Sequence, residues 1–136
     1  MTNKFEHDIM NNLKTLKLTS FFFLVALALF TGCKNNDPSV LKIFVRSASN
    51  ELVKDAKVII IGDVNSVPTS LAHVDTLVTN SSGFAAFNLD DYFTAAGEEN
   101  TVAYFDVIVK QDPKQAQAYV RCRAHITTVE TVYLPN

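Results

Sequence analysis

The chain has 136 residues, with 12 Lys and Arg side chains against 14 Asp and Glu, which gives a net charge of −2 at pH 7. The basic residues form no cluster, so the composition argues against a nucleic-acid partner, whose phosphates require clustered Lys and Arg. Two cysteines, Cys33 and Cys122, are too few for a disulfide framework or a structural zinc site, and we expect no cofactor.

The first element is an apolar segment from Phe21 to Phe30, preceded by Lys14 and Lys17. As a helix it would measure about 15 Å, half of the roughly 30 Å that a bilayer core requires. A basic stretch followed by a short apolar core is typical of a secretory signal peptide. The true start is left open between the first residue and Met10, because Met10 gives a more compact basic region.

The apolar segment ends in Phe30-Thr31-Gly32-Cys33, where small residues precede a cysteine. This ending resembles the lipobox of bacterial lipoproteins, in which the chain is cut before the cysteine and the cysteine carries lipid. The resemblance implies that residues 1–32 are a lipoprotein signal peptide and that residues 33–39 comprise lipidated Cys33 and a tether. The alternative is a plain signal anchor in which Cys33 is incidental.

The tether from Lys34 to Ser39 has no Asp directly after the cysteine, where inner-membrane lipoproteins carry their retention signal. It resembles the tethers of Bacteroidota lipoproteins. The resemblance implies lipid anchoring in the outer membrane, with the periplasmic and the extracellular face both left open.

Residues 40–136 predict one domain of about seven short antiparallel strands, because segments rich in β-branched and aromatic residues are separated by turns. The expected strands are Leu41–Arg46, Ala56–Ile61, Val74–Val78, Phe84–Leu89, Val102–Lys110, Val120–Ile126 and Glu130–Leu134. The second strand is apolar almost throughout, which predicts burial on both of its faces. The polar segment 90–100 shows no helical periodicity and is expected to be a loop. The predicted fold class is therefore all-β, a single Ig-like β-sandwich.

Two segments of the domain match known short patterns. Leu52 to Val58 match a turn that leads into "x-A-x-V" on a strand, and Thr79 to Phe87 match the hairpin pattern "T-x-x-x-G-x-x-x-F". Together they resemble the carboxypeptidase regulatory-like, or transthyretin-like, sandwich family. The resemblance implies a transthyretin-like sandwich that acts as a structural, spacing or binding module.

The best candidate contact site is a cationic row on one strand. Arg121, Arg123 and His125 alternate with apolar residues, so they are expected to point to the same side. Arg binds carboxylates in bidentate geometry, so the row suits an anionic glycan or a partner's carboxylate. The alternative is a solvated sheet face on which the row pairs with acidic neighbours such as Asp106 or Glu130.

Three smaller signals lie elsewhere in the domain. Asp75-Thr76-Leu77 matches the short O-glycosylation pattern of Bacteroidota, so Thr76 is a candidate glycan acceptor. His73 and Asp75 lie two positions apart and could form half of a metal site, but no third ligand is evident and an exposed polar edge is the alternative. Cys122 lies on the apolar side of its strand, so we expect a buried free thiol rather than a nucleophile.

The sequence thus predicts a membrane-anchored cell-envelope lipoprotein that acts as a non-catalytic structural or protein-interaction module. Its partners would be the membrane, through lipid on Cys33, and envelope proteins or glycans. The first alternative is a carbohydrate-binding surface module that stacks sugars on tyrosines such as Tyr92 or Tyr104. The second is a small hydrolase that depends on His73 or His125. No catalytic, cofactor-binding or metal-binding residue is assigned.

Overall fold

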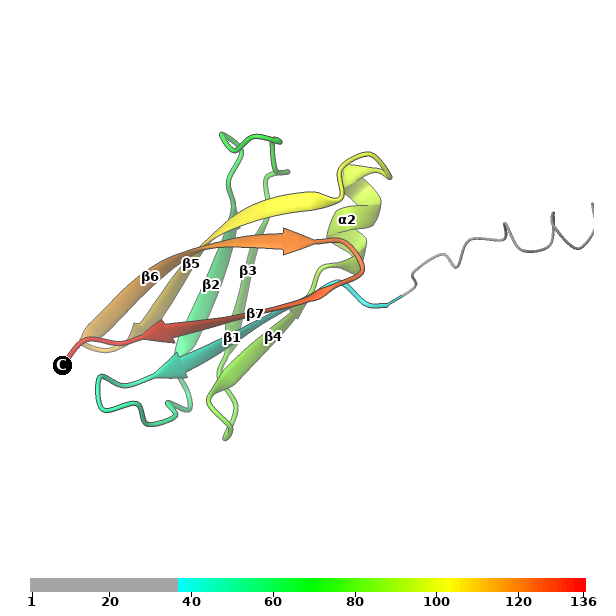
Figure 1. Ribbon diagram of the computed structural model, residues 1–136. Helices are drawn as coiled ribbons and strands as arrows, with labels where there is room; N and C mark the ends of the chain where they lie inside the picture. The colour runs from blue at the N-terminus through cyan, green and yellow to red at the C-terminus, as the bar shows by residue number, and fades with distance from the viewer. Residues whose placement is uncertain (1–36) are drawn as a thin grey trace, which may run out of the picture. The chain divides into compact units, whose positions relative to one another are not determined.

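The computed structural model describes residues 37–136 of the chain (Figure 1). The predicted signal peptide, its alternative start at Met10, the cleavage site and Cys33 lie outside the described residues. Within residues 37–136, no helix is long and apolar enough to cross a membrane.

The described residues form seven strands and one short helix. Their bounds are β1 Val40–Arg46, β2 Lys57–Gly62, β3 Val74–Val78, β4 Phe84–Asn88, α2 Asp90–Ala96, β5 Val102–Gln111, β6 Lys114–Arg123 and β7 Thr127–Tyr133. The strands form a three-stranded sheet in the order β4-β1-β7 and a four-stranded sheet in the order β3-β2-β5-β6. The prediction of an all-β domain with two sheets is therefore confirmed.

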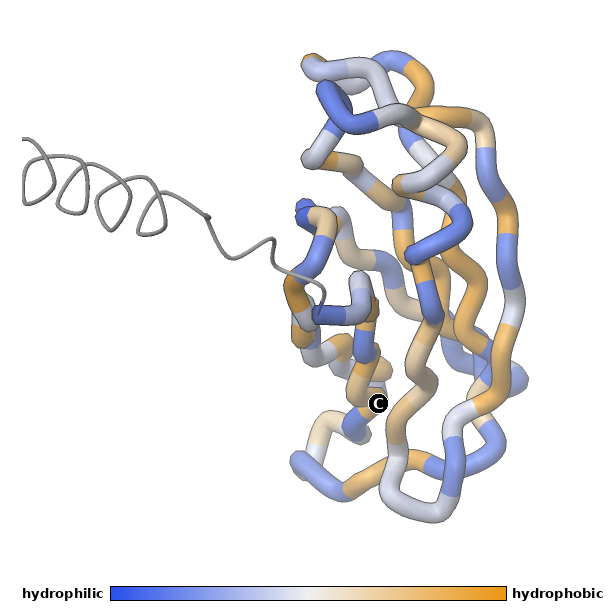
Figure 2. The backbone as a smooth tube through the Cα atoms, turned by 90° about the vertical axis from the view of Figure 1, so that its right-hand side faces the viewer, coloured by the Kyte–Doolittle hydropathy of each residue, from blue (hydrophilic) through white to orange (hydrophobic). Residues whose placement is uncertain are grey.

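Hydrophobic and hydrophilic residues alternate along the strands (Figure 2), and the core is made by the side chains that lie between the two sheets. On β1, Leu41, Ile43 and Val45 are fully buried, whereas the residues between them are only half-buried. The four-stranded sheet supplies the facing side chains, which include Val58, Ile60, Phe105, Val107 and Val109. Burial of this apolar surface holds the two sheets together, because removing apolar area from water is the main favourable contribution to folding.

The burial of β2 differs from the prediction. Val58 and Ile60 are fully buried, but Ile59 and Ile61 are only half-buried. These two isoleucines point away from the core, and no third layer of residues 37–136 packs over that side of the sheet. The expected burial on both faces is therefore wrong, and the outer side of β2 stays apolar and accessible.

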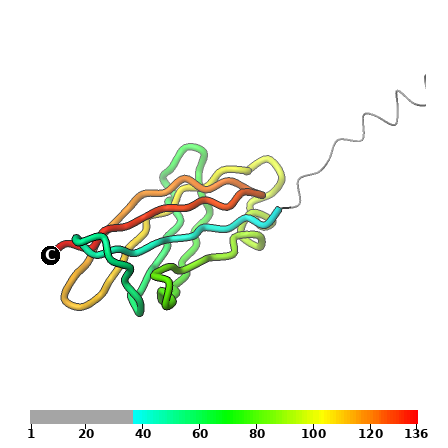
Figure 3. Tube along the Cα trace, turned by 60° about the horizontal axis from the view of Figure 1, so that its bottom comes forward, coloured from blue at the N-terminus to red at the C-terminus, as the bar shows by residue number. Residues whose placement is uncertain are grey.

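One strand pair departs from the predicted antiparallel arrangement. β1 and β7 pair in parallel, while the other four pairs are antiparallel. The reason is that the turn after β6 brings the start of β7 to the end of the molecule where β1 also starts (Figure 3). First and last strands of the domain then run side by side in the same direction.

Segment 90–96 is the helix α2 and not the loop that was predicted. Asp90 and Asp91 occupy its first turn, where negative charge is favourable, and Gly97 ends it with a φ of 86°. Tyr92 and Phe93 are buried. A two-turn helix is unstable in isolation, so the packing of these two rings supplies most of its stability. A helix of this length is too short to show a 3.6-residue period in sequence.

The chain joins the domain through Ser39, a residue that the prediction assigned to the tether. Ser39 is 1% exposed. Its N–H donates to Asp90 Oδ1 at 2.7 Å, and its backbone oxygen accepts the N–H of Leu89 at 2.8 Å. Its Oγ accepts the N–H of His125 at 2.9 Å. The structure therefore places Ser39 within the folded domain.

Candidate functional site

The outward side of the four-stranded sheet carries several of the residues that the sequence singled out, among them Arg121, Arg123, Thr76 and Tyr104. We call its side chains the four-strand face, because strand alternation and cross-strand register place them on one side. They are Lys57, Ile59 and Ile61 of β2, Val74, Thr76 and Val78 of β3, Val102, Tyr104, Asp106, Ile108 and Lys110 of β5, and Gln115, Gln117, Tyr119, Arg121 and Arg123 of β6.

The centre of the four-strand face is apolar. Ile59 of β2 lies directly opposite Ile108 of β5, and Ile61 lies opposite Val74 of the edge strand β3. Val74 is 67% exposed and Val78 is 55% exposed. An antiparallel sheet with one solvated face normally carries polar side chains there. A contiguous apolar patch bordered by polar residues is instead typical of an interaction surface.

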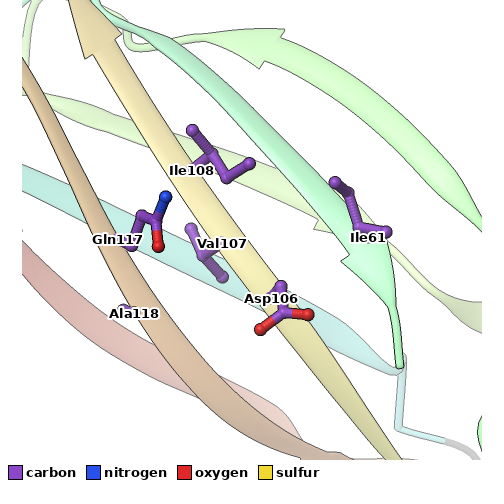
Figure 4. Close-up of a pocket in the computed structure, with 6 residues that line it drawn as sticks. All are labelled: Ile61, Asp106, Val107, Ile108, Gln117 and Ala118. Carbon is purple, nitrogen blue, oxygen red and sulfur yellow. The ribbon is translucent and has the colours of Figure 1, made fainter. Parts of the chain in front are cut away.

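A shallow hollow of about 270 Å³ lies in this apolar centre (Figure 4). Ile61 and Ile108 supply its apolar side chains, and Asp106 and Gln117 supply a carboxylate and an amide. The hollow is open to solvent, so it suits a side chain projecting from a partner better than an enclosed small molecule. Its two polar groups can accept and donate hydrogen bonds that orient such a side chain.

Cationic side chains border the apolar centre at both ends. Lys57 lies directly opposite Lys110, and Arg121 and Arg123 follow one another along β6. Like charges in directly opposed positions destabilise a sheet. None of these four cations makes an ion pair with an acidic side chain of residues 37–136, in contrast to Lys54, which pairs with Asp55.

The predicted row of Arg121, Arg123 and His125 is correct for the two arginines and wrong for the histidine. β6 ends at Arg123, and His125 lies in the following turn with a φ of 59°. The His125 N–H bonds Ser39 Oγ, and its Nδ1 lies 3.1 Å from the backbone oxygen of Asp37. These contacts come from residues more than 80 positions away, so local alternation could not reveal them.

Asp106 and Glu130, the expected acidic partners of the arginines, do not pair with them. Asp106 is on the four-strand face but lies opposite Tyr119 in the strand register. Glu130 belongs to β7 in the other sheet, where it lies opposite buried Ile43. No ion pair joins either carboxylate to Arg121 or Arg123 within the described residues. The arginine side chains are therefore available to an external anion.

Two tyrosines of the four-strand face form a stacked pair. The rings of Tyr104 and Tyr119 are 5.7 Å apart at an interplanar angle of 14°. Tyr119 donates its hydroxyl hydrogen to Asp63 Oδ2 at 2.8 Å, and this bond raises the pKa of Tyr119 to about 12. Sequence alternation placed Tyr104 on a strand, but the predicted sixth strand began at Val120 and left out Tyr119, and alternation could not give the register that brings the two rings together. Tyr92, also expected to stack sugars, is buried and accepts the N–H of Leu71.

Thr76 lies on the exposed edge of the four-strand face. It is opposite Ile59 and is flanked on the same side of β3 by Val74 and Val78. Its N–H donates to the carboxylate of Asp75 at 2.6 Å. A sugar on the exposed Thr76 side chain would therefore extend over or beside the apolar centre.

The remaining candidates lie away from this face. His73 precedes β3 and packs edge-on against the rings of Tyr92 and Phe105, at 5.4 and 6.2 Å between centroids. Within residues 37–136, no three His, Cys, Asp or Glu side chains lie close enough together to hold a metal ion. Cys122 is buried as predicted, and burial raises the pKa of its thiol to about 12. A thiol of that pKa is protonated at neutral pH and is a poor nucleophile.

No protein-family model matches the sequence, and no curated protein matches it either. Among solved structures, the fold is similar to the Bacillus anthracis TIE protein, with 15% identity and a TM-score of 0.48, over 74% of this chain and 17% of that one. It is also similar to chlorocatechol 1,2-dioxygenase from Pseudomonas putida, with 13% identity and a TM-score of 0.44, over 76% of this chain and 62% of that one. The chain thus spans less than two thirds of both proteins. At these scores neither similarity bears on activity, ligand or partner.

Proposed function

We propose that the protein is a cell-envelope lipoprotein, anchored in the outer membrane by lipid on Cys33, whose sandwich is a non-catalytic interaction module. The lipobox-like ending Phe30-Thr31-Gly32-Cys33 supports the anchor. The short segment between Cys33 and the buried Ser39 is consistent with a domain held at a membrane surface. One acyl chain binds a membrane only marginally, whereas two or more anchor a protein stably.

The partner we propose for the four-strand face is a protein whose contact surface has an apolar centre and an acidic rim. The observation that supports it best is Lys57 directly opposite Lys110, with no acidic side chain of residues 37–136 paired to either. Such a pair costs stability in the isolated sheet, and a partner carboxylate between the two ammonium groups would remove that cost. The half-buried Ile59 and Ile108 beside them offer the apolar contact that gives an interface most of its affinity.

The anchor is tested by intact mass and membrane partition of the protein expressed in a bacterium that processes lipoproteins, beside Cys33→Ala. We expect the mass of residues 33–136 plus acyl chains, and loss of both the acyl mass and the membrane association in the variant. Proteolysis of whole cells then distinguishes the periplasmic from the extracellular face. A mass that retains the N-terminal segment, or unchanged partition of the variant, would contradict the anchor.

The interaction surface is tested by a photo-crosslinking residue at position 108, in the middle of the four-strand face, in living cells. We expect a crosslinked protein that disappears in K57E/K110E and persists in the matched variant K54E, since Lys54 is exposed and lies outside this face. The crosslinked protein should bind the purified lipoprotein with an affinity that falls as salt rises. A crosslink that survives K57E/K110E, or none at all, would contradict the proposed surface.

A second candidate function is binding of an anionic glycan, and the Tyr104–Tyr119 pair favours it. The exposed ring of Tyr119, stacked on the half-buried ring of Tyr104 beside Arg121, suits a sugar that carries a carboxylate. On an array of uronic-acid glycans, this function requires a signal that Tyr104→Ala abolishes and Tyr133→Ala retains, because Tyr133 is exposed on the other sheet. No signal for the unaltered protein would rule out this candidate for the glycans displayed.

A further inference from the structure

The outward side of the three-stranded sheet is a second apolar surface, on the opposite side of the sandwich from the four-strand face. We call the outward side chains of β4, β1 and β7 the three-strand face. On it, Val129 is 54% exposed and Tyr133 is 56% exposed. The rings of Phe44 and Phe84 are half-buried with centroids 5.4 Å apart, and Lys42 Nζ lies 3.8 Å from the centre of the Phe84 ring. Apolar, aromatic and cationic groups are thus combined on one side.

The charge of the three-strand face is entirely positive. Lys42 and Arg46 are its charged side chains, and none of its positions is acidic, although residues 37–136 contain twelve Asp and Glu against eight Lys and Arg. Glu130 of β7 points to the other side of its strand, because it is in register with buried Ile43. A surface that is free of acidic groups in an acidic domain is complementary to an anionic one.

The tether fixes how far this domain can lie from a bilayer. Four residue steps separate Cys33 from Asp37, which span at most about 14 Å when fully extended. Part of that length crosses the headgroup layer, which is roughly 5–8 Å thick on each side of the hydrocarbon core. Asp37 therefore lies within about 10 Å of the headgroup surface, so one side of the domain faces the headgroups at close range. Ser39 then leads directly into β1, the central strand of the three-stranded sheet.

The end of the sandwich where the chain joins it is unsuited to face an anionic membrane. α2 and the loop after it place a cluster of carboxylates at that end, Asp90, Asp91 and Glu99, which outnumber Arg123 at the neighbouring end of β6. Anionic headgroups repel such a cluster. An upright domain is thus disfavoured, whereas the adjoining three-strand face offers cations and apolar side chains to the same headgroups.

We infer that the three-strand face lies flat on an anionic phospholipid surface, so that the four-strand face points away from the membrane toward its partner. This inference rests on the lipidation of Cys33 that is proposed above. Val129 and Tyr133 reach the boundary between headgroups and acyl chains, where amphipathic tyrosine rings are favoured. Lys42 lies along the Phe84 ring and extends its ammonium group to lipid phosphates. Lipid and partner then occupy opposite sides of the sandwich and do not compete.

Tryptophan fluorescence tests the orientation without background, because the chain contains no Trp. The lipidated protein is purified as V129W and, separately, as V78W, in which a valine of nearly equal exposure is replaced on the four-strand face. Each is reconstituted in vesicles of phosphatidylglycerol and phosphatidylcholine with brominated acyl chains. We expect a blue-shifted, quenched signal for V129W and an unquenched signal for V78W.

The role of charge has its own matched pair of variants. K42Q in the V129W background should reduce the quenching, and so should vesicles of phosphatidylcholine alone. K57Q, which removes a cation from the four-strand face, should leave the quenching unchanged.

Three results would overturn the inference. Quenching of V78W, or of neither variant, in a protein whose mass shows the acyl chains would contradict the orientation and leave the lipoprotein proposal intact. A blue shift of V129W without quenching, together with a dimer by light scattering, would identify a second copy on this face. A product without acyl chains would overturn the orientation and the proposed anchor together.

Discussion

The hydroxyl of Tyr119 on the edge strand β6 donates a hydrogen bond to Asp63, the residue that follows β2, at 2.8 Å. The bond therefore spans the intervening strand β5. Asp63 also donates its own N–H to the backbone oxygen of Tyr104, and its Oδ1 accepts the N–H of Asn65. The stacked tyrosines of the four-strand face are thereby fixed to the start of the loop between β2 and β3.

We expect this hydrogen bond to be visible in the ionisation of Tyr119. The bond to Asp63 raises the pKa of Tyr119 from 10.0 to about 12, because a phenolate there would face a carboxylate. The absorbance titration of the wild type minus that of Tyr119→Phe should show a single midpoint near pH 12, and Asp63→Asn should move it toward 10. Because the folded-state pKa is the higher one, this contribution to stability is complete below pH 10 and is lost as pH rises toward 12. A wild-type midpoint near 10 would contradict the bond.

A second titrating contact holds the first residues of the domain. The N–H of Ser39 donates to Asp90 and keeps the pKa of that carboxyl below its ordinary value of 3.8. The contribution to stability is therefore present above that value and is lost as pH falls through the lower folded-state pKa. At neutral pH, Asp90→Ala should accelerate amide exchange at Ser39, whereas the exposed neighbour Asp91→Ala should not. Equal rates of amide exchange at Ser39 in the two variants would mean that the bond to Asp90 does not hold Ser39 in the domain.

Strand positions could be predicted from sequence, because period-two alternation is a local property. Leu41, Ile43 and Val45 alternate with half-buried residues, and Cys122 lies on the buried side of its strand as expected. Gly83 forms a turn after β3, with a φ of 68°, but β3 and β4 lie in different sheets, so the predicted hairpin between them is wrong. The short helix at Asp90–Ala96 escaped prediction, since two turns cannot establish a 3.6-residue period and burial of its rings depends on the rest of the fold.

The candidate site could be predicted only in part, because its geometry depends on register between strands. Arg121 and Arg123 were assigned to one side from alternation alone. Lys57 and Lys110 lie opposite each other on strands that are about fifty residues apart in sequence. Nothing in the local sequence of either strand indicates this pairing. His125 was assigned to the row by continuing an alternation beyond the true end of β6. His125 instead lies in the turn after β6 with a positive φ, and its N–H bonds Ser39, a residue far away in sequence.

If Thr76 carries a glycan, the sugar and the partner protein compete for the same surface. Thr76 lies opposite Ile59 at the border of the apolar centre. We expect the mature protein to carry a sugar mass that Thr76→Ala removes, and the crosslink from position 108 to increase in that variant. Thr79→Ala is unsuitable as a control, because the Thr79 hydroxyl is buried and bonded to Val53. Thr69 is exposed and lies in the loop before β3. Thr69→Ala should therefore change neither the sugar mass nor the yield of the crosslink.

The two sides of β5 should respond very differently to truncation. Phe105 is fully buried and its ring contacts that of Tyr92, so Phe105→Ala should lower the free energy of unfolding by about 3–5 kcal/mol. Ile108→Ala removes a half-buried side chain from the outer side and should cost about 1 kcal/mol or less. Urea denaturation measures both values. An equal loss in the two variants would mean that the outer side of β5 is as buried as the core side.

Gly83 is required in the turn before β4 for two separable reasons. Its φ of 68° costs a residue with a side chain about 1–2 kcal/mol. In addition, a Cβ at this position would lie 2.9 Å from the Cβ of Leu52, closer than two carbons can approach without a shift. We therefore expect Gly83→Ala to lower the free energy of unfolding by more than the conformational cost alone.

A double-mutant cycle with Leu52→Gly separates the two reasons, because it removes the contacting Cβ and leaves the backbone conformation at position 83 unchanged. In the Leu52→Gly background, the effect of Gly83→Ala should fall toward the conformational cost of about 1–2 kcal/mol, because only the contact of the added Cβ with the Val53 backbone nitrogen, at 3.2 Å, then remains. The coupling energy between the two positions then measures the steric contact by itself. If Gly83→Ala cost the same in both backgrounds, the contact with Leu52 would contribute nothing and the positive φ alone would explain the glycine.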